Sequence, residues 1–230
     1  FDAATGTITE YTGESYRLDV PETIDGVSVR TIGANAFNGN WNLIYLTLPE
    51  GLTAIEDGAF ESAYQLSFVE FPSTLRTIGN RAFYNYRGGK LMLPEGLERI
   101  GDEAFYRCSV RGTLELPEGL KEIGDSAFAR SIFMRTLDLP STLEIIGEHA
   151  FEDVSLSYVY MDGLTPPKVA KTAFAECTSL ADIELNEYCT KQQMLDMQAI
   201  IDEAGLNCRV WRYENTQTSM AKGASYIYNP

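Results

Sequence analysis

The chain has 230 residues, of which 44% are hydrophobic and 22% charged, enough apolar material for a sizeable core. Thirty-three acidic residues against eighteen basic ones give a net charge of −15. This balance argues against nucleic acid and against an anionic membrane surface as partners, since both attract clustered Lys and Arg. No apolar run approaches the roughly 18 residues that would span a bilayer. Because the chain begins at Phe1 and not at Met, we expect a mature or trimmed fragment without its export signal.

The first 20 residues predict an N-terminal cap. Thr7–Tyr11 and Tyr16–Val20 flank a polar turn, a pattern typical of a β-hairpin. The sequence LDVP at 18–21 is the first of a series of strand triplets, and residues 24–29 lengthen the coil that follows it, as a second turn.

A repeat dominates the chain from this point. The pair Ala-Phe recurs every 22 or 23 residues, with its Phe at Phe37, Phe60, Phe83, Phe105, Phe128, Phe151 and Phe174. A second marker, two apolar residues around one variable residue and followed by Pro, keeps the same register at LTLP (46–49), VEFP (69–72), LMLP (91–94), LELP (114–117) and LDLP (137–140). The repeating unit is therefore L-x-L-P-x-x-L-x-x-I-G-x-x-A-F.

Each part of this unit has a physical role. The triplet alternates apolar and variable residues, so it predicts a short strand with two side chains inside and one outside. Pro ends the strand because it has no N–H to donate, and Gly allows a tight bend, with a positive φ where one is needed. Stacked coils would place the seven Phe side chains in one file through the core.

The end of the repeat region departs from this unit. VYMD at 159–162 has Asp in the place of the triplet Pro, and a last strand is expected at Ile183–Leu185. Thr190 and Gln193 form the pattern of a capping box that opens a helix ending near Ala204.

The sequence CRVWRY at 208–213 predicts a final edge strand, so that residues 186–213 form a C-terminal cap with one helix and one strand. Residues 214–230 are a tail that is polar except for Tyr226–Tyr228. The whole chain, 1–230, is thus expected to be one repeat domain.

The four cysteines do not predict a zinc site, since none forms a C-x-x-C pair and no His lies at ligand spacing. Cys108 and Cys177 each follow a repeat Phe by three residues and are interpreted as small buried residues. Cys189 and Cys208 flank the predicted helix, at opposite ends of the cap if the strands are parallel, which disfavours a disulfide.

The run L-P-x-x-L-x-x-I-G-x-x-A-F resembles the BspA-type leucine-rich repeat of bacterial surface proteins, over about residues 18–185. The resemblance implies a right-handed superhelix with short parallel strands lining one face. It also implies an extracellular or cell-surface location, and several members of the family are linked to adhesion and host-protein binding. The repeat builds a scaffold and does not itself specify a ligand.

If the triplets pair in parallel, two files of side chains face outward, and they combine acids with aromatic rings that do not belong to the core. From these files we take a candidate binding face of Tyr45, Phe68, Glu70, Glu115, Asp138, Tyr158, Tyr160, Asp182 and Glu184. A solvated face with residues that favour strands is the alternative. The stretches after each Phe offer a second surface, for whose aromatic residues packing is the preferred interpretation: Trp41, Tyr64, Tyr84, Tyr86, Tyr106 and Phe133.

Motifs of catalysis are not found. His149 is the one His of the chain and occupies a variable position of the repeat, and there is no G-x-S-x-G, H-E-x-x-H or G-x-G-x-x-G. Glu115 and Asp138 on neighbouring strands could share Ca²⁺, but nothing supplies the six to eight oxygens that calcium needs. We therefore expect no enzyme, no cofactor and no metal. The leading hypothesis is a binding or adhesion module for a protein or glycan partner, and the alternative is a structural spacer of a larger surface protein.

Overall fold

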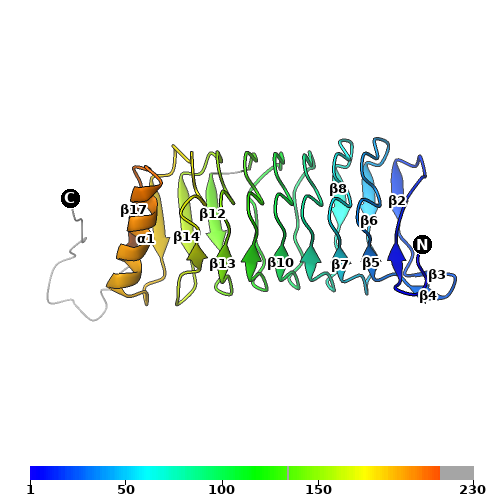
Figure 1. The fold of residues 1–230 in the computed structure, drawn as a ribbon, viewed down its shortest axis with the longest axis horizontal. Coiled ribbons are helices and arrows are strands. Elements are labelled where there is room, and N and C mark those ends of the chain that lie inside the picture. Colours follow the sequence, from blue (N-terminus) through cyan, green and yellow to red (C-terminus); the bar gives the residue numbers. More distant parts are fainter. Residues whose placement is uncertain (134, 213–230) are drawn as a thin grey trace.

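The computed structural model describes residues 1–133 and 135–212. The chain winds into coils that stack along one long axis, with the N-terminus at one end and helix α1 (Lys191–Glu203) at the other (Figure 1). Neighbouring coils pair through parallel strands. The predicted repeat solenoid is therefore confirmed. The tail 214–230 and the end of the last predicted strand at Tyr213 lie outside the described residues.

The apolar-x-apolar triplets form one face of the stack, here called the strand face. Its strands make a three-stranded parallel sheet and a four-stranded parallel sheet. They are β2 (Arg17–Asp19), β6 (Tyr45–Thr47) and β8 (Phe68–Glu70), then β12 (Thr136–Leu139), β14 (Tyr158–Met161), β16 (Asp182–Leu185) and β17 (Arg209–Arg212). Between the two sheets lie the triplets of two coils, where the described residues form the isolated bridges Met92–Glu115 and Glu115–Asp138.

A second parallel sheet, the longest of the structure with eight strands, runs along another side of the stack and was not predicted. Each of its strands is a two-residue segment that ends on Ile or Val, in most coils directly before the repeat Gly. The strands are β1 (Thr7–Ile8), β5 (Thr31–Ile32), β7 (Ala54–Ile55), β9 (Thr77–Ile78), β10 (Arg99–Ile100), β11 (Glu122–Ile123), β13 (Ile145–Ile146) and β15 (Lys168–Val169). Two residues are too few to show an alternating pattern, so the sequence by itself does not predict these strands.

The repeat Phe residues form the predicted file through the core. All seven rings are at most 2% exposed. Consecutive rings stack with centroid separations from 4.8 to 5.6 Å and interplanar angles of at most 22°. Buried rings in offset stacks contribute beyond the area they bury, so this file is a principal source of the contact between coils.

The repeat Gly is required for close approach between coils and not for a positive φ, which corrects the expectation from the sequence. A Cβ on Gly101 would lie 2.5 Å from Oδ1 of Asn80 in the preceding coil, and one on Gly124 would lie 2.4 Å from Oδ1 of Asp102. These side-chain oxygens accept hydrogen bonds from the next coil, since the N–H of Asp102 donates to Asn80 at 2.8 Å and that of Asp125 to Asp102 at 2.9 Å. A larger residue at the Gly position would push this ladder apart.

Positive φ angles occur at two other positions in most coils, two residues before and two residues after the repeat Phe. In the first file they are at Asn35, Gly58, Arg81, Glu103, Ser126 and His149, and in the second at Gly39, Ser62, Asn85, Arg107, Arg130, Asp153 and Glu176. Most of these residues are not Gly, so every such coil keeps residues with a Cβ in a region that costs energy.

The N-terminal hairpin predicted between Thr7–Tyr11 and Tyr16–Val20 is wrong. β1 pairs in parallel with β5, and β2 pairs in parallel with β6, so this segment is itself the first coil of the stack. Pairing with the next coil satisfies the backbone edge of both sheets, which a separate hairpin would leave open. The antiparallel pair of this region is β3 (Thr23–Ile24) with β4 (Val27–Ser28), around the two-residue turn Asp25–Gly26, in which both residues have positive φ.

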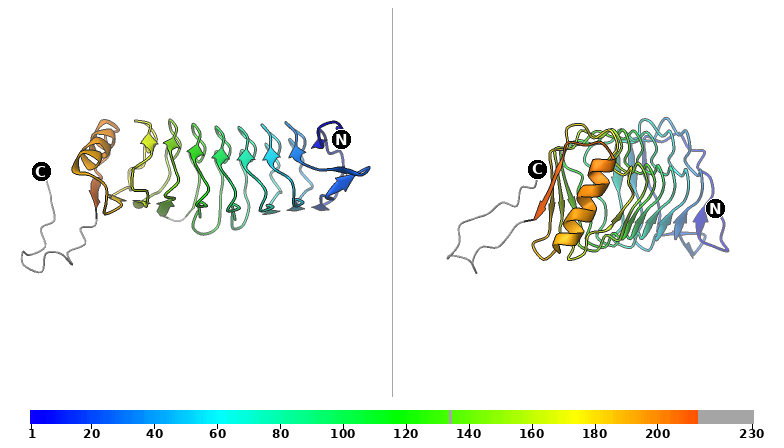
Figure 2. Two further views of the ribbon diagram at one scale, coloured as in Figure 1. Left: turned by 90° about the horizontal axis from the view of Figure 1, so that it is seen from below. Right: turned by 60° about the vertical axis from the view of Figure 1, so that its left-hand side comes forward.

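The C-terminal cap is as predicted. The Thr190 side chain accepts from the Gln193 N–H while the Gln193 side chain accepts from the Thr190 N–H, so the capping box is present. Figure 2 shows α1 across the end of the stack, where Met197 and Ile201 are its buried residues. After the helix, β17 pairs in parallel with β16.

All four cysteines are buried free thiols. The Cys108 S–H donates to the carbonyl oxygen of Phe83 at 3.3 Å, and that of Cys177 to Phe151 at 3.0 Å. Their interpretation as buried residues is confirmed, and each thiol also links its coil to the preceding Phe. Burial raises the pKa of Cys177 to about 11, which keeps the thiol protonated at neutral pH.

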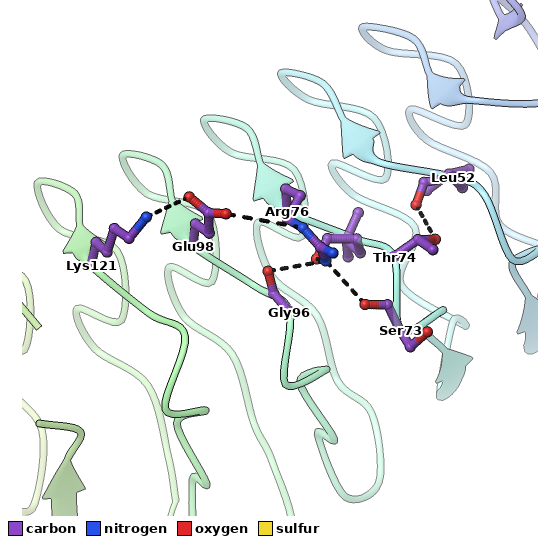
Figure 3. A network of polar contacts seen from close by, with 8 residues as sticks. Leu52, Ser73, Thr74, Arg76, Gly96, Glu98 and Lys121 are labelled. Carbon is purple, nitrogen blue, oxygen red and sulfur yellow. Dashed lines mark hydrogen bonds and ion pairs between the residues drawn. The ribbon is translucent and has the colours of Figure 1, made fainter. Parts of the chain in front are cut away.

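Charged side chains link coils on the outside of the stack. The Arg76 guanidinium donates to the carbonyl oxygens of Ser73 at 3.0 Å and Gly96 at 3.2 Å, and lies 4.0 Å from the Glu98 carboxylate (Figure 3). Lys121 of the following coil reaches the same carboxylate at 2.8 Å. Arg76, Glu98 and Lys121 thus form an ion-pair ladder across three coils.

Candidate functional site

The strand face points the predicted site residues outward, because side chains alternate along each triplet, and Tyr158, Tyr160, Asp182 and Glu184 are half-buried there. In β12, Thr136 and Asp138 are exposed while Leu137 and Leu139 are buried. The predicted residues nevertheless do not form one surface. They divide into an N-terminal cluster of Tyr45, Phe68 and Glu70, a C-terminal cluster of Asp138, Tyr158, Tyr160, Asp182 and Glu184, and Glu115 between them.

The N-terminal cluster is an exposed aromatic pair. Tyr45 on β6 and Phe68 on β8 stack with centroids 5.0 Å apart and an interplanar angle of 9°, while 41% and 51% of their surfaces remain exposed. Beside them, the Glu70 carboxylate accepts a hydrogen bond from the Thr47 hydroxyl at 3.3 Å. Each ring therefore covers one face of the other, and their outer edges stay open to a partner.

The C-terminal cluster is held together by strand register. Asp138, Tyr160 and Glu184 are direct neighbours across β12, β14 and β16, and Tyr158 is the neighbour of Asp182. Since adjacent strands lie about 4.8 Å apart, Tyr160 stands between the acids Asp138 and Glu184, whereas Tyr158 stands between Thr136 and Asp182.

Hydrogen bonds fix several of these side chains. The Tyr158 hydroxyl donates to the Glu184 carboxylate, and the Tyr160 hydroxyl donates to Asp162 at 3.0 Å. Burial raises the pKa of the Glu184 carboxyl. Burial, followed by the bond to Asp162, also raises the pKa of the Tyr160 phenol. The Tyr160 phenol thus remains a neutral donor at physiological pH.

A shallow depression lies beside Tyr160. The carboxylates of Glu118, Asp138 and Asp162 edge it, and its remaining lining is Leu116, Leu139 and Pro140. Sequence reasoning named only Tyr160 and Asp138 of these. The signal for Asp162 was its place in VYMD, where other coils have Pro, whereas nothing distinguishes Glu118 from the Glu that follows the triplet Pro in other coils.

Glu115 adjoins the C-terminal cluster, as the bridged neighbour of Asp138, but pairs with a cation. Its carboxylate lies 3.0 Å from the Lys90 ammonium group. Among the described residues, no group of three or more His, Cys, Asp or Glu side chains is arranged to hold a metal ion. The shared calcium site weighed for Glu115 and Asp138 therefore has no geometric support.

His149 lies on the surface, as its variable position suggested. Its Nδ1 is 2.7 Å from the Glu152 carboxylate, with 41% of its side chain exposed. His149 is also one of the residues with positive φ. Within the part of the chain that the structure describes, His149 pairs with Glu152 of its own coil and with no other charged group.

The aromatic residues after each Phe lie in three different environments. Tyr86 and Phe133 are buried in the core, and the Tyr86 hydroxyl donates to the Ser67 carbonyl oxygen at 3.0 Å. Trp41 and Tyr64, by contrast, are 72% and 52% exposed. The remaining two, Tyr84 and Tyr106, stack on each other at 5.1 Å. Packing explains four of the six, and the other two add exposed aromatic surface to the N-terminal coils.

Comparison with known proteins agrees with this fold. The family model for the BspA type leucine rich repeat region matches six copies over residues 30–157 and 99–195. A leucine-rich cell surface protein from Faecalibacterium prausnitzii has a solved structure with a TM-score of 0.56 and 18% sequence identity, covering 90% of this chain and 72% of that one. A leucine-rich repeat protein from Treponema pallidum has a TM-score of 0.49 and 20% identity, covering 84% and 87%. The identity to the Faecalibacterium prausnitzii protein is low, so this similarity concerns the fold alone.

No curated protein matches the sequence. Within the described residues, no helix has the length and apolar character needed to cross a membrane. The family match covers well over half of the chain, and the repeat it describes is the one that builds the stack of coils. The chain therefore belongs to the BspA-type leucine-rich repeat family.

Proposed function

We propose that this chain is a non-catalytic binding module of a bacterial surface or secreted protein, and that it holds a protein or glycan partner on its strand face. The C-terminal cluster is the principal contact. The observation that carries the proposal is the depression beside Tyr160, where three carboxylates surround a tyrosine and an apolar floor. Such a surface offers a ring for packing and acceptors for the hydroxyl groups of a sugar or the cations of a protein.

Two further points support this function. The strand face carries large exposed aromatic residues, Tyr45 and Phe68, at the polar phase of the repeat, where packing does not require them. The family consists of repeats of bacterial surface proteins, and the similar protein of Faecalibacterium prausnitzii is itself described as a cell surface protein.

Screening on a glycan array and by pull-down from host extracellular proteins, followed by titration of any ligand found, tests the proposal. Tyr160→Ala combined with Asp138→Asn should weaken binding by about tenfold or more, since one ring contact and one charged contact are lost. Tyr64→Ala is the matched control, because it removes an equally large ring that is 52% exposed but lies away from the strand face.

An unchanged dissociation constant in the double variant would place the ligand elsewhere. If no ligand is retained by the wild-type chain in either screen, the alternative of a structural spacer replaces a binding module. Circular dichroism and urea unfolding of both variants separate a lost contact from a lost fold.

A further inference from the structure

The charge of the molecule is unevenly distributed along the stack. Residues 76–135 contain ten of the eighteen basic residues and only eight of the thirty-three acidic ones. The middle of the chain is therefore slightly positive, while both ends are strongly acidic. Such a reversal of sign in a protein with a net charge of −15 is a feature that solubility does not require.

The excess of positive charge lies after the repeat Phe in three consecutive coils. The segments 83–94, 105–114 and 128–137 contain no Asp or Glu. Their basic residues are Arg87, Lys90, Arg107, Arg111, Arg130 and Arg135. Lys90 is neutralised by Glu115 on the strand face. In contrast, the structure gives Arg87, Arg107 and Arg111 no acidic partner among the described residues, and all three are exposed.

Aromatic rings accompany these arginines. Tyr84 and Tyr106, in the same position of adjacent coils, stack with centroids 5.1 Å apart and an interplanar angle of 10°. The Arg81 guanidinium lies 4.2 Å from the centre of the Tyr84 ring, and the Arg107 guanidinium lies 5.5 Å from that of Tyr106. Arg81 forms ion pairs with Glu61 and Glu103, whereas the described residues give the Arg107 guanidinium only the contact with the Tyr106 ring.

Arg107 and Arg130 occupy the same position in adjacent coils, two residues after the Phe. The N–H of Arg107 donates to the Ala129 carbonyl oxygen at 2.9 Å, so the two backbones are in direct register, about 4.8 Å apart as in any parallel pair. Arg130 is held by Glu152 at 3.2 Å. That hydrogen bond first, and the nearby Tyr106 phenol second, raise the pKa of Arg130. Two guanidinium groups thus stand next to one half-buried ring.

We propose that this surface, the arginine ridge of Arg87, Arg107, Arg111 and Arg130 with Tyr84 and Tyr106, binds an anionic polysaccharide that carries sulfate or carboxylate groups. Guanidinium groups bind such anions through paired N–H donors. The stacked tyrosines supply an apolar surface for the C–H face of a sugar ring and hydroxyl groups for its oxygens.

The shape of the charge distribution favours a short anionic ligand. A nucleic acid or a membrane surface would extend past the three basic coils and meet the acidic ends of the stack, which repel it. A run of a few charged sugar rings fits on the ridge, which spans roughly 10 Å from the first coil to the third. This site is separate from the strand face and does not depend on the function proposed there.

The test uses a sulfated glucosamine–uronate tetrasaccharide as the probe, with its unsulfated N-acetylated counterpart and an oligoglutamate peptide as comparison ligands. Calorimetric titration at 50 and 150 mM NaCl gives the affinity and its salt dependence. Arg107→Gln/Arg111→Gln should weaken binding of the sulfated probe by about tenfold or more. The control variant Arg99→Gln/Lys121→Gln removes the same amount of positive charge on the side of the eight-stranded sheet. Arg99 and Lys121 are paired there with Glu122 and Glu98, so this variant should leave the affinity for the probe unchanged.

Three results would overturn the proposal. The first is that the sulfated probe fails to bind at 50 mM NaCl. The second is that both double variants lose affinity to the same extent, which would indicate general electrostatic attraction. Alternatively, the oligoglutamate peptide binds as tightly and with the same dependence on Arg107 and Arg111, which makes the ridge a site for acidic peptides. Tyr160→Ala/Asp138→Asn should retain binding of the sulfated probe, so failure of the strand-face proposal leaves this one standing.

Discussion

At several positions, the regular coil requires residues with a Cβ to adopt a positive φ, which costs conformational energy. Two residues in most coils lie in the left-handed region, and at the position two before the Phe only Gly58 in that file lacks a Cβ. Asn favours this region more than other residues with side chains do, and Asn35 takes it in the first full repeat. Arg81, Glu103 and Ser126 have no such preference. They are tolerated because the backbone bonds of the neighbouring coils fix the turn.

Replacing Ser126, which has a φ of 54°, by Gly should therefore stabilise the fold. The relief of left-handed strain exceeds the larger entropy of Gly in the unfolded chain, for a net gain of about 0.5–1 kcal/mol. The urea midpoint of unfolding measures the gain. Ser155→Gly is the control, because Ser155 is exposed without a positive φ, and it should lower the midpoint. Equal effects of the two changes would contradict the explanation.

The capping box is the clearest case at the scale of one element. Thr190 ends the loop and starts α1, and its hydroxyl accepts from the Gln193 N–H. Thr190→Ala should destabilise the cap by about 1 kcal/mol, and hydrogen exchange should speed up in the first turn of α1. Thr190→Ser keeps an oxygen at the same place and should retain most of the protection. Fast exchange in both variants would mean that packing, and not the hydroxyl, holds this end.

The ion-pair ladder between coils predicts a pH dependence. The hydrogen bond from Lys121, its charge and that of Arg76 lower the pKa of the Glu98 carboxyl below its usual value. A carboxyl whose pKa is lowered by folding adds stability that is present above its unfolded-state pKa and is lost as the pH falls through the folded value. The contribution of the Glu98 carboxylate should accordingly disappear below about pH 4.5.

Urea midpoints of wild type and Glu98→Gln, measured from pH 7 to pH 3, test this dependence. The difference between the two should be largest at neutral pH and should shrink in acid, and added salt should reduce it because the pair is exposed. Glu14→Gln, an exposed carboxylate of the N-terminal coil, is the control. A constant difference across the pH range would exclude a role of the charge.

At the scale of the whole molecule, the stack is a one-dimensional array in which each coil contacts its neighbours. Phe105 lies in the middle of the file, fully buried between the rings of Phe83 at 5.3 Å and Phe128 at 5.4 Å. Phe105→Ala should cost about 3–5 kcal/mol through the cavity it leaves. The loss of hydrogen-exchange protection should be greatest in coils 91–139.

Trp41→Ala is the comparison for this change, since Trp41 is equally aromatic but 72% exposed, and it should leave stability within about 0.5 kcal/mol of wild type. Protection that stays unchanged in coils 91–139 of Phe105→Ala, or that is lost evenly along the chain, would contradict an array held together by neighbour contacts.

The sequence determined the architecture because its signals repeat. Each Phe of the file, each triplet and the capping box at Thr190 is a local pattern whose consequence depends only on the adjacent coil, which has the same pattern. The outward phase of Tyr45, Phe68, Tyr158 and Tyr160 could be predicted for the same reason, since side chains of a strand alternate.

Tertiary structure alone decided how those residues group. The interruption of the strand face between Glu70 and Met92, the bond between Tyr158 and Glu184 and the part of Asp162 in the depression depend on which coils pair regularly and how side chains turn. The N-terminal segment likewise forms a coil and not a hairpin because the next coil offers the open strand edges of β5 and β6 for pairing. Core positions must be buried, and the regular spacing of apolar residues in the sequence therefore predicts them. Surface clusters depend on contacts between side chains of coils about 23 residues apart, and no local sequence pattern predicts those contacts.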